Sequence, residues 1–179
     1  PGPHGARDPH AALTPDKHAQ VALQHLAEGR LALAMDTLTQ AIERYPEADQ
    51  LYGIRGNLLL EQDNVTAALA DLETAIRLAP DNPVYLTNRA QAYRKFRRDE
   101  EALADLNRAI ELNGDLVFAR FNRGALSFSQ GDYDTALTYH QRSLTIFERI
   151  EDDQRALVGR ARALNGIANV HQAKGDFKQ

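Results

Sequence analysis

The sequence predicts an all-α fold, a right-handed solenoid in which antiparallel helix pairs stack one after another. The first observation behind this prediction is a period of 34 residues, because the same residue types recur at that step. A fixed step of this length indicates one structural unit that is repeated and stacked. The second observation is that apolar residues recur at spacings of three and four, which is typical of amphipathic helices. The clearest members of the period are Ala34, Ala68, Ala102, Ala136, Leu38, Leu72, Leu106, Arg55, Arg89 and Arg123.

Turn-forming residues divide the chain into the expected helices. Pro46, Pro80, Gly114 and Gly131 each end an apolar period, as helix-terminating residues do. Residues 1–14 precede the first period and hold three of the seven prolines, a composition that favours an extended tail. Helix pairs are expected at 16–28 with 31–44, 49–62 with 65–78, 83–96 with 99–112 and 117–130 with 133–149, followed by one helix at 154–174.

We therefore expect a tail over residues 1–14 and a repeat domain over residues 15–179. The fourth repeat is longer than the others, because its turn Gly131-Asp132-Tyr133 recurs only 44 residues later, at Gly175-Asp176-Phe177. The extra residues between 147 and 160 predict two longer helices that join near residues 151–153. The repeats are expected at about 15–48, 49–82, 83–116, 117–160 (extended) and 161–179 (partial).

The last expected helix carries much apolar surface. Its packing positions are expected at Leu164, Ile167, Ala168 and His171. Its outward face is expected to include Val158, Val170 and Phe177. Because an end repeat needs a polar outer face, we expect the natural protein to continue with further repeats. In this chain we expect that face to contact another copy.

The composition argues against several classes of function. A formal net charge of −4 provides no basic field for nucleic acid, and the absence of cysteine excludes a thiolate metal site or a cysteine nucleophile. No apolar run approaches the roughly 20 residues that span a bilayer. Glycine-rich phosphate loops, zinc spacings and nucleophile elbows are missing as well. We therefore expect no enzymatic activity, no cofactor, no metal, no nucleic acid and no membrane insertion.

The repeat resembles the tetratricopeptide repeat. In that family a large and then a small residue lie in the middle of the first helix, and Ala, Leu or an aromatic residue, Ala and Pro follow on the second. The second repeat matches this pattern with Tyr52, Gly56, Ala68, Leu72, Ala75 and Pro80. The other repeats are in phase, so that the resemblance covers residues 15–177. It implies a non-enzymatic scaffold that binds a peptide or helix of another protein in a concave groove lined by the first helices.

Two kinds of side chain at the implied groove positions suit binding. Amide side chains can hydrogen-bond an extended peptide on both sides, and aromatic rings can anchor an apolar side chain. Arg162, Asn165 and Asn169 face the same groove in the family's phase. The alternative for the phenylalanines is that a long helix or the tail of this chain covers them. The expected partner-binding residues are Asn57, Asn88, Gln91, Arg94, Phe118, Phe121, Asn122 and Phe128.

One ligand known in the family is an acidic C-terminus, which is held by two asparagines and three basic residues. Asn57 and Asn88 match the asparagine positions of that carboxylate clamp. The basic positions fall on Gly53, Phe118 and Asn122, which carry no charge. We therefore predict that this clamp is absent and that the ligand is more apolar or mixed.

Three other clusters have a structural interpretation. Arg55, Arg89 and Arg123 are expected to pair with carboxylates of the second helices, such as Asp71 and Asp105. The run of residues 94–98 is expected to be a solvated helix end, where cations suit the helix dipole. Core positions, rather than metal ligation, are expected for His18, His25, His140 and His171.

Two functions of a different class remain open from the sequence. In the first, the chain is a self-assembly module of a larger oligomeric complex. In the second, it is the adaptor region of a larger protein whose catalytic domain lies elsewhere. Either would still use helix surfaces rather than a catalytic cleft, and the expected self-association is through the C-terminal helix.

Overall fold

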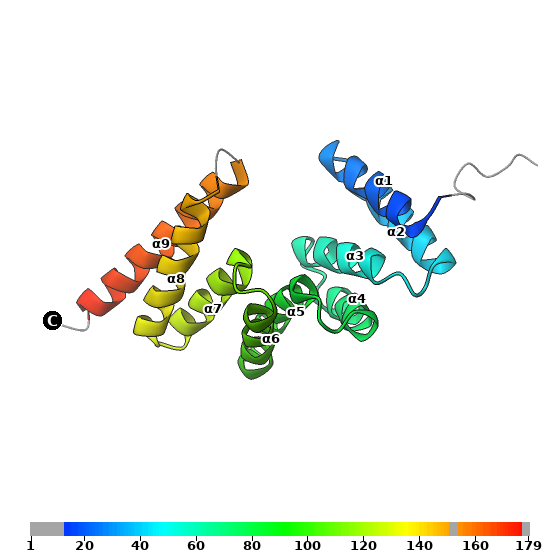
Figure 1. The fold of residues 1–179 in the computed structure, drawn as a ribbon. Helices are drawn as coiled ribbons and strands as arrows, with labels where there is room; N and C mark the ends of the chain where they lie inside the picture. The colour runs from blue at the N-terminus through cyan, green and yellow to red at the C-terminus, as the bar shows by residue number, and fades with distance from the viewer. Residues whose placement is uncertain (1–12, 151–153, 177–179) are drawn as a thin grey trace, which may run out of the picture. The chain divides into compact units, whose positions relative to one another are not determined.

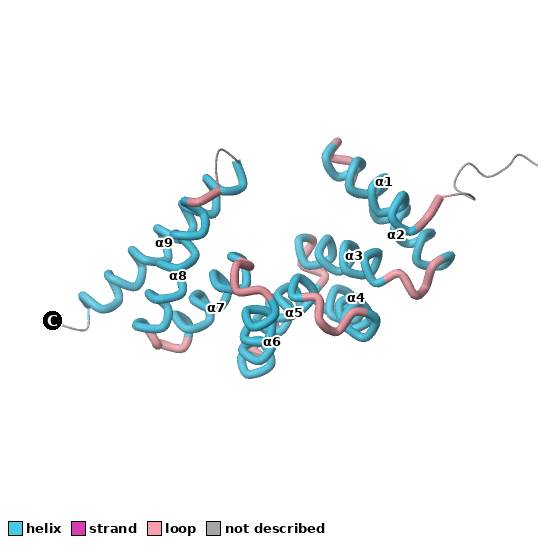
Figure 2. Tube along the Cα trace, in the orientation of Figure 1, coloured by secondary structure: helices cyan, strands magenta, loops and turns pink. Residues whose placement is uncertain are grey.

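The computed structural model describes residues 13–150 and 154–176, and these form nine α-helices and no strand (Figures 1 and 2). The predicted all-α fold is therefore confirmed, and the expected helix bounds differ from the observed ones by at most two residues. Residues 1–12 of the expected tail and the expected junction at 151–153 lie outside the described residues. The helices are α1 (Pro15–Ala27), α2 (Leu31–Arg44), α3 (Asp49–Glu61), α4 (Val65–Leu78), α5 (Pro83–Lys95), α6 (Asp99–Leu112), α7 (Val117–Ser129), α8 (Tyr133–Glu148) and α9 (Gln154–Asp176).

Side-chain caps begin three of the helices. Thr14 Oγ1 accepts a hydrogen bond from the backbone N–H of Lys17 at 3.3 Å, and Pro15 follows at the first helical position of α1. Asn82 caps α5 and Asp132 caps α8 in the same manner. Each cap satisfies a backbone donor that the helix itself leaves without a partner, which fixes where the helix starts.

A left-handed residue closes the turn between the two helices of each of the first four pairs. The carbonyls at the end of the first helix then accept hydrogen bonds from the turn, as in α7, where the N–H of Asp132 donates to Ser127 O at 3.0 Å. This backbone conformation recurs at the same step of 34 residues as the side chains. The left-handed residues are Gly29, Asp63, Arg97 and Gly131, with φ of 72°, 61°, 60° and 78°.

The chain divides into two compact units, one ending at Pro80 and one beginning at Asp81. In the first unit α2 packs against α1, α3 contacts both of them, and α4 pairs with α3. Its core combines small alanines with large leucines, so Ala22, Leu38 and Leu51 are fully buried. A Cβ atom added at Gly56 would lie 2.9 Å from Leu72 Cγ, which explains the small residue in the middle of α3.

The second unit holds α5 to α9, and small residues set how closely its last helices approach. His140 of α8 lies between Gly124 of α7 and Gly166 of α9. A Cβ atom added at these glycines would lie 2.9 and 2.8 Å from the imidazole. Phe147 fills a similar contact against Gly159. The close approach of α7, α8 and α9 therefore depends on residues without a side chain.

The last two described helices are longer than the other seven. The first seven helices have 13 or 14 residues, whereas α8 has 16 and α9 has 23. Arg160 of α9 joins the two by donating to Phe147 O at 3.0 Å and to Ile150 O at 2.8 Å. The repeat boundary expected at residue 160 thus falls inside a continuous helix.

The buried face of α9 differs from the expected one. Its buried residues include Ala156, Ala163 and Val170. Its exposed residues include Leu164, Ala168 and His171. The predictions that these three pack inside and that Val170 faces outward are therefore wrong. The extra residues before α9 shift its phase, and its small side chains let it pack closely on α7 and α8. Phe177 lies outside the described residues.

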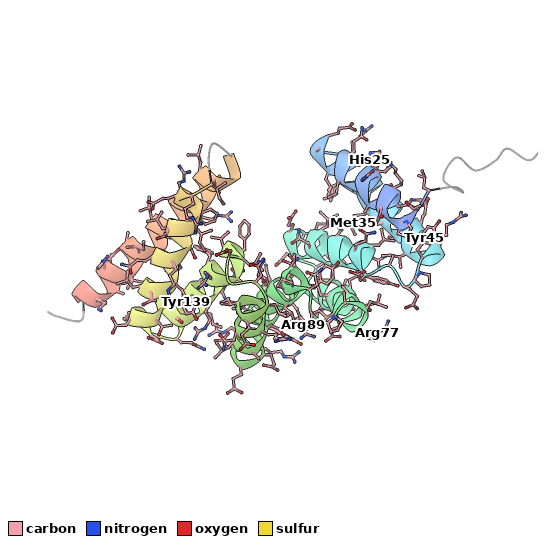
Figure 3. The ribbon with its side chains drawn as sticks, viewed as in Figure 1. His25, Met35, Tyr45, Arg77, Arg89 and Tyr139 are labelled. Atoms are coloured by element: carbon pink, nitrogen blue, oxygen red, sulfur yellow. The ribbon has the colours of Figure 1, made fainter. Side chains whose placement is uncertain are left out.

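Arginine–aspartate pairs link the two helices of the second and third repeats. Arg55 donates from Nε and Nη2 to Asp71 at 2.7 and 2.8 Å, and Arg89 meets Asp105 at the same distances. The expected inter-helix pairing is therefore confirmed for these two arginines. In the fourth repeat Tyr139 takes the place of the aspartate, and the Arg123 guanidinium lies 5.3 Å from its ring centroid. Figure 3 labels Arg89 and Tyr139.

Candidate functional site

Two adjoining hollows in the second unit form the candidate site. The first, of about 380 Å³, is lined by α5, α7 and α9. The second, of about 350 Å³, continues along α7 and α9 to His140 of α8. The hollows share Arg94, Phe121 and Arg162, so we treat them as one groove. The other lining residues are Gln91, Lys95, Phe118 and Asn122 in the first hollow, and Ala125, Phe128, Ser129, His140, Asn165, Gly166 and Asn169 in the second.

The aromatic residues of the groove come from one face of α7. Phe118, Phe121 and Phe128 are spaced by three and seven residues, which places them on the same side of a helix. Phe118 is 48% exposed although its ring meets Phe147 edge-on, with centroids 6.1 Å apart. Phe121 and Phe128 are half-buried. An exposed aromatic ring in a concave surface offers a contact for an apolar side chain of a partner.

The groove is cationic. Arg94, Lys95 and Arg162 line it, and no carboxylate lines either hollow within the described part of the chain. Arg94 is half-buried and makes no hydrogen bond or ion pair with any described residue. Burial lowers the pKa of Arg94, and the charge of Asp99 opposes this shift. The guanidinium nevertheless stays charged at physiological pH.

His140 forms part of the groove wall and of the core at once. It is 3% exposed, it lies between Gly124 and Gly166, and its ring centroid is 5.3 Å from that of Phe121. Its Nδ1 atom has no hydrogen-bond partner among the described residues. Burial lowers the pKa of His140, so the neutral imidazole is favoured in the folded protein.

The structure brings most of the expected binding residues together. Asn88 is half-buried and lines neither hollow. Asn57 lies in the first unit, where its Nδ2 donates to Glu61 Oε1 at 3.0 Å. Asn122 lines the groove but is only 8% exposed, which limits how much of its amide a partner can reach. The residues that line the groove as expected are Gln91, Arg94, Phe118, Phe121, Asn122 and Phe128.

The basic run at the end of α5 differs in part from its expected role. Arg98 lies at the surface, where it binds Glu101 at 2.9 Å and lies 4.4 Å from the ring centroid of Tyr93. Arg94 and Lys95, in contrast, line the groove. The sequence placed His140 in the core but missed that it also lines the groove. Its only sequence signal is the small residue at Gly124, where a groove helix approaches α8.

Metal and membrane sites find no support in the described ranges. Within residues 13–150 and 154–176, no three histidine, aspartate or glutamate side chains gather closely enough to hold a metal ion. None of the described helices is both long and apolar enough to cross a bilayer.

Comparison with known families gives one result. Models described as tetratricopeptide repeat match residues 22–83, 55–116 and 116–179. Tetratricopeptide repeat protein 6 of Homo sapiens is 28% identical over 118 residues, which are 66% of this chain and 22% of that protein. Hsp70-Hsp90 organizing protein 2 of Arabidopsis thaliana is 28% identical over 123 residues, 69% of this chain and 21% of that protein. The chain thus spans only 22% and 21% of the length of these relatives.

A solved structure shows the same architecture with a ligand. The first TPR of Spaghetti, bound to an HSP90 peptide, superposes with a TM-score of 0.61 at 25% identity. The match covers 71% of this chain and 93% of the Spaghetti chain.

Proposed function

Because this chain belongs to the tetratricopeptide repeat family, we propose that it is a non-enzymatic protein-interaction scaffold whose groove holds a segment of another protein. The partner is an extended peptide or a helix, and it lies against α5, α7 and α9. Peptide binding by a relative of the same architecture supports this proposal. Binding rather than catalysis fits a site made of aromatic rings, amides and cations.

The observation that carries the proposal is the aromatic face of α7 inside a polar groove. Phe118 remains 48% exposed inside the groove, where an apolar side chain of a partner would remove its ring from water. Gln91, Asn165 and Asn169 surround the rings with amides that both donate and accept hydrogen bonds. A peptide needs both features, because its side chains require apolar contacts and its backbone requires hydrogen bonds.

The test compares two phenylalanines that are exposed to a similar degree. Phe118 lines the groove, whereas Phe96 is 44% exposed and lines neither hollow. Proteins recovered from a lysate by the wild type and by Phe96→Ala are quantified by mass spectrometry. We expect Phe118→Ala to lose a defined set of these partners while its thermal unfolding stays close to that of the wild type. Equal recovery by all three proteins would contradict the groove as the binding site.

Self-assembly is a second candidate that a specific surface favours. Leu157, Val158 and Leu164 of α9 are 60%, 53% and 54% exposed, and together they leave apolar surface on one helix. Such a surface is buried when two copies meet through α9. Light scattering over a range of concentrations should then show a dimer that Leu157→Glu with Leu164→Glu converts to a monomer. A wild-type monomer at all concentrations would reject this candidate.

An adaptor role within a larger protein is compatible with either candidate. The relatives named above are several times longer than this chain. The full-length gene sequence decides whether a catalytic domain accompanies the groove.

A further inference from the structure

We propose that the groove recognises an acidic side chain flanked on both sides by large apolar side chains, at an inner position of a partner peptide. This proposal rests on the proposed function, because it names the chemistry of the segment that the groove binds. Three features of the second unit support it: an arginine with no acceptor among the described residues, a described groove wall that holds no carboxylate, and aromatic rings on either side of the charge.

Arg94 is exceptional among the arginines of this structure. Six described arginines are half-buried, and five of them donate a side-chain hydrogen bond to a described acceptor. Arg94 makes no hydrogen bond or ion pair with a described residue. A half-buried guanidinium without a protein acceptor is available to one from a partner, and a carboxylate can accept two of its parallel N–H bonds. The five arginines with an acceptor are Arg55, Arg89, Arg120, Arg123 and Arg160.

The surroundings of Arg94 favour an anion. Arg162 of α9 lines both hollows with it, and Lys95 lines the first. No described carboxylate lines the groove, so its described wall places no negative side chain beside Arg94 and Arg162. Asp99 acts on Arg94 but does not line the groove. Charge complementarity therefore selects a partner that brings its own carboxylate.

The apolar contacts lie on both sides of this charge. Arg94, Phe121 and Arg162 are common to the two hollows, while Phe118 lines only the first and Phe128 only the second. A segment that crosses both hollows thus meets an aromatic ring, then the cations, then another aromatic ring. The matching segment has an apolar side chain, an acidic side chain and an apolar side chain in that order. Since the groove continues past the cations, the acid belongs at an inner position and not at a chain end.

This chemistry differs from the clamp that the sequence analysis considered. The family's basic positions fall on Gly53, Phe118 and Asn122 and carry no charge. The cations of this groove come instead from the end of α5 and from α9. The aromatic ring of Phe118 occupies one of the positions where the clamp has a basic residue.

The experiment selects peptides without assuming a partner. A display library of random segments of about twelve residues, held between spacers at both ends, is selected on the full chain and on its variants. The variants are Arg94→Gln, Arg94→Lys, Phe118→Ala and the control Arg142→Gln, which removes an exposed arginine outside the groove. A second library ends in a free carboxylate. Thermal unfolding confirms that each variant is folded before selection.

We expect the wild type and Arg142→Gln to enrich segments with Asp or Glu next to large apolar residues. Arg94→Gln should keep the apolar preference and lose the acidic one, and Arg94→Lys should retain part of it. For a synthetic enriched peptide with blocked ends, Arg94→Gln should raise the Kd about tenfold in fluorescence anisotropy. Changing the acidic residue of the peptide to its amide should raise the Kd to a similar extent. Both changes together should raise the Kd little further than either one alone.

Other results separate this inference from the proposed function. Groove-dependent segments without an acid, or an acidic preference that Arg94→Gln retains, would overturn the inference and leave the scaffold proposal standing. If segments are enriched only from the library that ends in a free carboxylate, the groove binds a chain end, and the proposal that the acid lies at an inner position of the peptide is overturned. If no enriched segment depends on Phe118, the groove itself is not the binding site and the proposed function fails.

Discussion

At the scale of single residues, the repeat keeps a charge pair that joins its two helices. Arg55 with Asp71 and Arg89 with Asp105 share the same two-bond geometry. Asp71 is 7% exposed, so its carboxylate depends on the arginine for hydrogen bonds that water no longer supplies. The hydrogen bond to Asp71 also raises the pKa of Arg55, whose guanidinium is charged at any physiological pH in any case.

Replacing Asp71 by asparagine should destabilise the fold. We expect Asp71→Asn to lower the free energy of unfolding by about 2 kcal/mol, because it breaks a nearly buried charged hydrogen-bond pair. Urea unfolding followed by circular dichroism measures the change. The control is Asp81→Asn, which removes an exposed partner of Arg108 and should cost less than about 1 kcal/mol. Equal losses for both variants would show that burial of the pair does not matter.

Protonation of His140 should weaken the second unit. Burial lowers the pKa of His140 in the folded protein, so below about pH 6.5 the unfolded chain binds a proton that the folded chain resists. The free energy of unfolding should therefore fall as the pH falls below that value.

The measurement is urea unfolding of the wild type and of His140→Gln across this pH range. The free energy of unfolding of His140→Gln should depend less on pH than that of the wild type. The difference between the two proteins gives the contribution of His140 separately from that of the other five histidines. An identical pH dependence in both proteins would mean that His140 does not titrate differently on folding.

At the scale of helices, the turn inside each pair imposes one backbone conformation on unrelated residues. Two of the four left-handed positions are glycine, but Asp63 and Arg97 adopt the same φ with a side chain. A left-handed conformation costs residues with a Cβ atom about 1 kcal/mol or more. The turn is therefore preserved by the hydrogen bonds that close it, even where its residue type is unfavourable.

Glycine at residue 97 should relieve this cost. We expect Arg97→Gly to raise the free energy of unfolding by about 0.5–1 kcal/mol, less than the full strain because glycine also loosens the unfolded chain. Chemical denaturation measures the gain. Arg97→Ala serves as the control, since it removes the charge and keeps the strain, and it should leave stability nearly unchanged. A gain of equal size in Arg97→Ala would assign the effect to charge.

At the scale of the whole molecule, the groove belongs entirely to the second unit. All of its lining residues lie after Asp81, on α5, α7, α8 and α9. The first unit has a core of its own, formed by residues such as Ala22, Leu38 and Leu51. The stability of such repeats is a sum over contacts between neighbouring helices. The second unit should therefore be able to fold without the first.

The fragment of residues 81–179 should therefore fold and bind without the first unit. We expect a helical circular dichroism spectrum, a cooperative thermal transition, and a Kd for the display-selected peptide within about twofold of the full chain. The fragment carrying Phe118→Ala is the control and should bind more weakly. An unfolded fragment would show that the second unit depends on residues before 81.

The sequence predicts the regular part of this fold well and the irregular part poorly. Turn residues and the alanine period locate α1 to α8, because each repeat confirms the phase of its neighbours. The extra residues before α9 break that phase. Burial there follows the small residues Ala156 and Ala163, while the larger Leu164 remains exposed, so hydrophobicity alone points to the wrong face. Arg94 and Arg162 line the same groove because of this packing of α9.

The order in which helices meet has a consequence for biosynthesis. Within each unit every helix packs against the next one or the next but one, as α5 does with α6 and α7. During synthesis, therefore, no helix depends on a partner that is distant in the sequence. Each helix pair can pack while the ribosome is still adding the following pair. The groove is the exception, because α9 is needed to complete it. The protein thus acquires its binding surface only as translation of this region finishes.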